Sequence, residues 1–90
     1  MLKVEVTYSG NLVDSYKFDQ PVVTIGRSIE NDLVLDVLGI RRHHCKVVSD
    51  VIFPVEGSVM VNGITVDAAL SLKRGDNIQV EKFTLEVQEI

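Results

Sequence analysis

The stretch TIGRSIENDLVLDVLGIRRHHCKV, residues 24–47, is the most informative part of this 90-residue chain. It places a Gly-Arg pair, Gly26-Arg27, at the end of an expected strand and an Asn-Asp pair, Asn31-Asp32, a few residues later. An Arg-Arg-His-His-Cys run then leads into another expected strand. Glycine lets the chain leave a strand sharply, and Asn and Asp side chains cap turns. The segment therefore predicts strands joined by a structured loop.

Short strand patterns continue on both sides of this stretch. Hydrophobic and polar residues alternate with the period of a strand in most of them. The expected strands cover residues 1–8, 12–18, 22–25, 33–35, 45–48, 51–55, 58–61 and 64–66, with a final hairpin over 78–87. The turn signals are Ser9-Gly10-Asn11, Asn62-Gly63, Arg74-Gly75-Asp76 and Glu81-Lys82. Only residues 67–72 are a candidate for a helix, and that segment is short. Many short strands with regular turns indicate an all-β sandwich or barrel.

Size and composition narrow the class of protein. We expect one domain, residues 1–90, with a single core, since 46% of the residues are hydrophobic. A net charge of −4 argues against nucleic-acid binding. No apolar run or leader suggests direct membrane contact. The single Cys45 forms no internal disulfide, so a cytoplasmic location is the expectation.

Cations are concentrated in one region of this acidic chain. The chain has Arg27, Arg41, Arg42 and Lys46 close together with both histidines. This clustering fits an anion site and scattered solvated side chains equally well. No metal site is expected, because the adjacent residues of His-His-Cys point to opposite faces of a strand and no second ligand pair exists. We also expect no cofactor and no enzyme activity. The segment GRSIEND lacks the second glycine and the lysine of a phosphate-binding loop, and no nucleophile has an activating frame.

The order of these motifs resembles that of the forkhead-associated (FHA) domain over nearly the whole chain. The shared features are the Gly-Arg and Asn-Asp pairs, the His-Cys entry into a strand, the Val-Asn-Gly hairpin at 61–63 and the Gly-Asp at 75–76 before the last hairpin. The resemblance implies an FHA-like β-sandwich of two antiparallel or mixed sheets, with binding loops at one end. It also implies a phosphothreonine-containing protein or peptide as the partner, in Ser/Thr-kinase signalling.

The resemblance assigns roles to individual residues. Arg27 matches the arginine that contacts phosphothreonine, and the alternative is an arginine paired with Glu30 or Asp32. His44 matches a histidine that braces the loop, which favours a buried, hydrogen-bonded ring over a ligand contact. The other residues expected to support the binding loops are Gly26, Asn31, Asn62 and Gly63.

Two positions depart from the family pattern. Arg41 stands where the family has the serine of Ser-x-x-His, and Gly57 where it has the asparagine of Asn-Gly-Thr. Ser58 could replace part of that asparagine's contact through its hydroxyl. The predicted phosphopeptide-binding residues are therefore Arg27, Arg41, Arg42 and Ser58. The alternative is a degenerate FHA-like scaffold or assembly domain, which binds protein partners without phosphate through an apolar sheet face.

Overall fold

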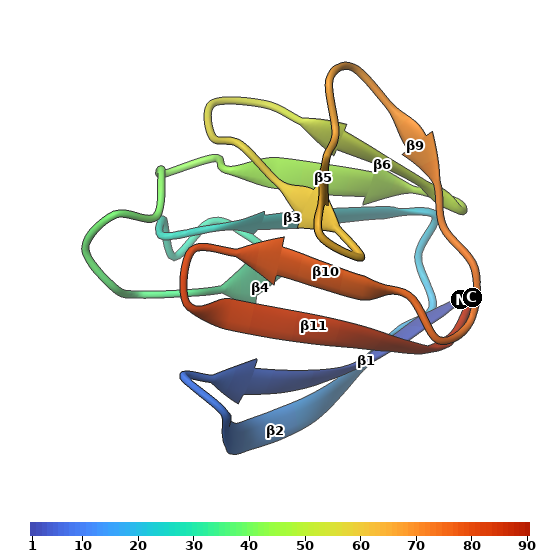
Figure 1. Cartoon of the computed structure of the whole chain (residues 1–90), viewed down its shortest axis with the longest axis horizontal. Coiled ribbons are helices and arrows are strands. Elements are labelled where there is room, and N and C mark those ends of the chain that lie inside the picture. The colour runs from blue at the N-terminus through green and yellow to red at the C-terminus, as the bar shows by residue number, and fades with distance from the viewer.

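Two β-sheets pack face to face in the computed structural model, which describes all 90 residues (Figure 1). The first sheet has the strand order β2-β1-β11-β10-β7-β8, and the second has the order β4-β3-β5-β6-β9. The strands are β1 Leu2–Tyr8, β2 Asn11–Phe18, β3 Val22–Gly26, β4 Leu33–Val34, β5 Cys45–Val48, β6 Val51–Pro54, β7 Met60–Val61, β8 Ile64–Thr65, β9 Leu70–Ser71, β10 Asn77–Val80 and β11 Phe83–Glu89. Only the β3–β4 pair is parallel among the paired strands. The predicted all-β sandwich of antiparallel and mixed sheets is confirmed.

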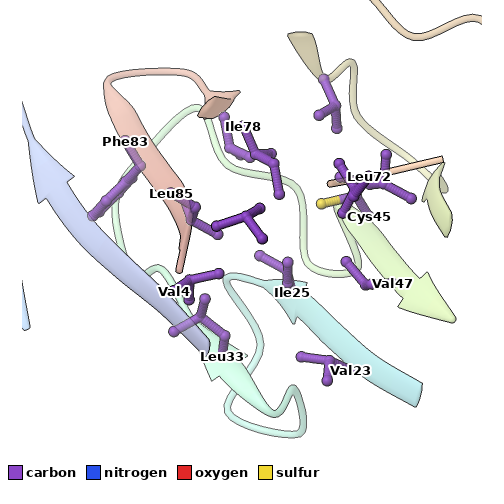
Figure 2. Close-up of a cluster of buried hydrophobic side chains, with 14 of the residues drawn as sticks. Val4, Val23, Ile25, Leu33, Cys45, Val47, Leu72, Ile78, Phe83 and Leu85 are labelled. Atoms are coloured by element: carbon purple, nitrogen blue, oxygen red, sulfur yellow. The ribbon is translucent and has the colours of Figure 1, made fainter. Parts of the chain in front are cut away.

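The core lies between the two sheets and follows the alternation in the sequence. Leu2, Val4 and Val6 of β1 are buried, because every second side chain of a strand points to the same face. Twenty buried residues form one hydrophobic cluster. In Figure 2, Val4 and Leu85 from the first sheet gather in this cluster with Ile25 from the second. Burying one such side chain contributes roughly 1.5–3 kcal/mol, so the cluster fixes the two sheets against each other.

The segment 67–72, the one candidate for a helix, contains a strand instead. Leu70–Ser71 forms β9 at the edge of the second sheet, antiparallel to β6. The backbone N–H of Leu72 donates to the carbonyl of Asp50, and the Leu72 side chain is buried in the core. Six residues are too few to nucleate a stable helix, so pairing with β6 satisfies this backbone.

The loops that the sequence predicts to form the binding site lie at one end of the sandwich. The connections β3–β4, β4–β5 and β6–β7 and the β10–β11 turn are on the left in Figure 1. The termini lie at the other end, where Lys3 pairs with Glu89. The structure has no helix with the length and hydrophobicity of a membrane span.

The Asn62-Gly63 turn is placed away from these loops. Both residues have positive φ, 52° and 81°, as this hairpin turn requires. Asn62 Nδ2 donates to Asp76 Oδ1 at 2.9 Å, and the N–H of Asn77 donates to Asn62 Oδ1 at 2.9 Å. Asn62 and Gly63 thus support the start of β10. The loops described above lie at the other end of this strand, where the β10–β11 turn begins at Glu81.

Candidate functional site

Two backbone hydrogen bonds bring the arginine-bearing loops together. The N–H of Arg27 donates to the carbonyl of Arg41 at 2.9 Å, and the N–H of Ser28 donates to the carbonyl of Arg42 at 3.1 Å. Arg27 follows β3 directly, while Arg41 and Arg42 lie just before β5, its antiparallel neighbour. The antiparallel pairing of β3 and β5 therefore places three arginines at the same end of the second sheet.

Gly26 permits this close approach of the two loops. A β-carbon at Gly26 would overlap the carbonyl oxygen of Arg42 and would lie 2.9 Å from Nδ2 of Asn31. Its φ lies outside the left-handed region. The sequence correctly marks Gly26 as a special position, but the expected reason, a sharp exit from the strand, is wrong. The position needs glycine because backbone from another loop occupies the space of a side chain.

Asn31 fastens the same two loops from inside. Its side chain is only 8% exposed, and Nδ2 donates to the carbonyls of Ser28 at 2.8 Å and Arg42 at 2.7 Å. Because both partners are acceptors, the amide nitrogen must face them. The Asn31 side chain thus holds the β3–β4 loop beside the residue that precedes His43.

The acids considered as partners of Arg27 form hydrogen bonds elsewhere. Asp32 accepts from the backbone N–H of Thr24 at 2.9 Å and from its hydroxyl at 3.2 Å. Glu30 accepts a long hydrogen bond from the Ser28 hydroxyl at 3.5 Å. The half-buried Arg27 is therefore available to an external anion.

His44 joins a second pair of loops. The ring is 1% exposed. Its Nδ1 accepts from the backbone N–H of Arg41 at 3.0 Å, and Nε2 lies 2.8 Å from the carbonyl oxygen of Ser58. An amide can only donate and a carbonyl can only accept, so these partners assign the tautomer protonated at Nε2. The imidazole thereby ties the β4–β5 loop to the β6–β7 loop.

Gly57 covers the His44 ring. A β-carbon at Gly57 would overlap Cε1, Nε2 and Nδ1 of the imidazole. Gly57, which the sequence predicts to replace the asparagine of the family pattern, therefore has a packing reason in this chain. Sequence reasoning missed this contact, because the two residues meet only when two separate loops are folded.

An open cleft of about 540 Å³ lies where these loops meet. Its lining residues are Arg27, Gly39, Ile40, Arg41, Arg42 and Glu56. Three of the four predicted phosphopeptide-binding residues are thus brought together. The fourth, Ser58, lines a different shallow hollow with Met60, Gln79 and Glu81, and its carbonyl accepts from His44.

Glu56 is the charged lining residue that sequence reasoning missed, beside the uncharged Gly39 and Ile40. Its Oε1 accepts from the backbone N–H of His43 at 2.9 Å, and its own N–H donates to the carbonyl of His43 at 3.1 Å. The only sequence signal is its position directly before Gly57, where the family pattern is broken.

The chemistry of the cleft is that of an anion site. Three arginines and one glutamate line the cleft, in a protein whose net charge is −4. Guanidinium groups present planar pairs of donors that match phosphate oxygens, and their charge persists at every physiological pH. Nearby Cys45 is buried, and desolvation raises the pKa of its thiol from 9.0 to about 12, so it is a core side chain and no nucleophile.

Comparison with known proteins identifies the family. The family model of the FHA domain matches residues 23–81, and the chain therefore belongs to the FHA domain family. A search of the curated proteins gives no match.

Solved structures agree with this assignment. EmbR from Mycobacterium tuberculosis, solved in complex with a low-affinity phosphopeptide, is 25% identical with a TM-score of 0.84; the match covers 97% of this chain and 24% of the EmbR chain. The FHA domain of the CT664 protein from Chlamydia trachomatis is 16% identical with a TM-score of 0.86, covering 99% of this chain and 97% of the other. An FHA domain from Arabidopsis thaliana is 21% identical with a TM-score of 0.75, and the match covers 99% of this chain and 86% of the other. The chain thus spans only about a quarter of the length of EmbR.

Proposed function

We propose that this FHA domain is a protein-interaction module that binds phosphothreonine peptides in the arginine cleft, within Ser/Thr-kinase signalling. The observation that carries the proposal is the convergence of Arg27, Arg41 and Arg42 on one open cleft. The complex of the related EmbR structure with a phosphopeptide supports it. A phosphothreonine carries nearly two negative charges at neutral pH, which suits a site built from several guanidinium groups.

The three arginines have different parts in the proposal. Arg27 is half-buried and its backbone N–H donates to the carbonyl of Arg41, so we assign the main phosphate contact to its guanidinium group. A hydrogen bond to a charged group contributes about 1.5–3 kcal/mol. Arg41 and Arg42 are exposed and add attraction that replaces the missing serine hydroxyl. The Ser58 hydroxyl has no part here, because that residue lines the separate hollow.

The test is a calorimetric titration at low salt with a degenerate phosphothreonine peptide library and with the same library unphosphorylated. We expect binding that depends on the phosphate and that Arg27→Ala weakens more than about tenfold. Arg74→Ala is the matched control, because Arg74 is exposed in the turn before β10 and lies outside the cleft. No heat from a folded sample, or equal binding of both libraries, would contradict the proposal.

One observation favours a second function, in which partners bind without phosphate. Val22, Val48 and Val51 are in register across β3, β5 and β6 on the outer face of the second sheet. Lys46 lies beside them with Nζ 5.8 Å from the centre of the Phe53 ring. This second function requires phosphate-independent binding that Val48→Lys abolishes and Arg27→Ala leaves intact.

A further inference from the structure

One acidic residue, Glu56, lines the cleft together with the three arginines, and it belongs to a different loop from theirs. Arg27, Arg41 and Arg42 belong to the β3–β4 and β4–β5 connections, whereas Glu56 belongs to the β6–β7 connection. The site therefore has a cationic side and an anionic side. A phosphate bound by the arginines would lie in the same cleft as the Glu56 side chain.

Glu56 is held in this place by the fold. Oε1 accepts from the N–H of His43 at 2.9 Å, and the Glu56 N–H donates to the His43 carbonyl at 3.1 Å. These two bonds clamp the β6–β7 loop to the β4–β5 loop, next to the hydrogen bonds of His44. The clamp uses one carboxylate oxygen and leaves Oε2 for another donor.

A fixed carboxylate beside an anion site changes which ligands bind well. It repels an acidic residue next to the phosphate and attracts a basic one. Repulsion and attraction therefore both contribute to the difference in affinity between the two kinds of ligand. A ligand with a phosphate and a neighbouring cation matches both sides of the cleft. A ligand with acidic neighbours matches only the arginines.

We propose that Glu56 is a specificity-determining residue, which makes the cleft prefer phosphothreonine peptides with a lysine or arginine close to the phosphothreonine. This inference rests on the proposed function. The peptide extends from its phosphate past the β6–β7 loop, and its cationic side chain donates to Oε2 of Glu56. An exposed pair of this kind is worth up to about fivefold in affinity at low salt.

The experiment compares the wild type with Glu56→Gln. The glutamine keeps an oxygen that can accept from the His43 N–H and removes only the charge, so the loop clamp is preserved. The probes are phosphothreonine libraries that are degenerate except at one position near the phosphothreonine, which is fixed as lysine or as glutamate and moved in turn. Binding is measured by calorimetry at low salt and again with added salt.

We expect the wild type to bind the lysine library about fivefold more tightly than the glutamate library at one or more positions. Glu56→Gln should lose most of this ratio and bind the glutamate library more tightly than the wild type does. Phosphate-dependent binding with no lysine preference, or with a preference that Glu56→Gln retains, overturns the inference and leaves the proposed function in place. Absence of phosphate-dependent binding in the wild type overturns both.

Discussion

Gly57 packs against the imidazole of His44, so closely that a β-carbon at position 57 would overlap three ring atoms. The ring in turn spans two loops, with Nδ1 at the N–H of Arg41 and Nε2 at the carbonyl of Ser58. The architecture of the binding end thus depends on a glycine that makes no hydrogen bond to the ring. Its contribution to the ring contact is the space that it leaves, while its N–H donates to the backbone carbonyl of His44 at 3.1 Å.

Gly57→Ala should therefore destabilise the fold. The methyl group would push either the buried ring or the β6–β7 backbone, and overpacking of this kind costs about 1–3 kcal/mol. The measurement is the free energy of unfolding from urea denaturation. A variant as stable as the wild type would show that the ring has room to move.

A double-mutant cycle with His44→Ala is the control for this contact. His44→Ala alone should lower the free energy of unfolding, because it leaves the Arg41 N–H and the Ser58 carbonyl without their buried partner. In the double variant the added methyl group meets no ring, so its cost should fall below the cost in the wild type. If the costs of the two single substitutions simply added in the double variant, the strain caused by Gly57→Ala would not arise from the His44 ring.

Asn31→Asp should be more harmful than Asn31→Ala. Nδ2 of Asn31 donates to the carbonyls of Ser28 and Arg42, and an aspartate would turn a carboxylate oxygen toward both acceptors. A buried charge without a donor costs at least about 2 kcal/mol. Alanine removes the two hydrogen bonds without adding charge. Urea denaturation of both variants tests this order, and equal stabilities would mean that solvent reaches the site.

Local patterns account for the part of the structure that the sequence predicts. The alternation of Leu2, Val4 and Val6 indicates a half-buried strand, and Asn62-Gly63 indicates a hairpin turn, because both signals depend on neighbouring residues only. The order of such signals along the chain was enough to predict the β-sandwich and the FHA family.

Contacts between distant loops account for what the sequence does not predict. The stacking of Gly57 on His44 and the clamp between Glu56 and His43 exist only once the β4–β5 and β6–β7 loops are in place. The role of Gly26 was misread for the same reason, since its neighbour is the carbonyl of Arg42. Arg27 and Arg41 were assigned to the binding site through the resemblance to the FHA domain, whereas Glu56, the single acid that lines the cleft, lies on a loop without a strong pattern.

Arg41→Ser should weaken phosphopeptide binding, although it returns the serine of the family pattern. The substitution removes a guanidinium from the cleft, and an exposed charge contributes up to about fivefold in affinity at low salt. The fold should be unaffected, because His44 bonds the backbone N–H of Arg41 and not its side chain. Titration with the phosphothreonine library measures the loss, which should shrink as salt is added. Arg74→Ser is the control for general charge, and tighter binding by Arg41→Ser would mean that the arginine obstructs the phosphate.

The buried thiol of Cys45 should make the free energy of unfolding fall at alkaline pH. Burial raises its pKa in the folded protein from 9.0 to about 12, whereas the unfolded chain has the ordinary value. Below pH 9 the thiol is protonated in both states and its contribution to stability is complete. Above pH 9 only the unfolded chain releases the proton, so stability is lost by about 1.4 kcal/mol per pH unit up to pH 12. The measurement is the difference in free energy of unfolding between the wild type and Cys45→Ala, in which the other alkaline titrations cancel. That difference should decline steadily above pH 9, and a constant difference would show that the thiol ionises equally in the two states.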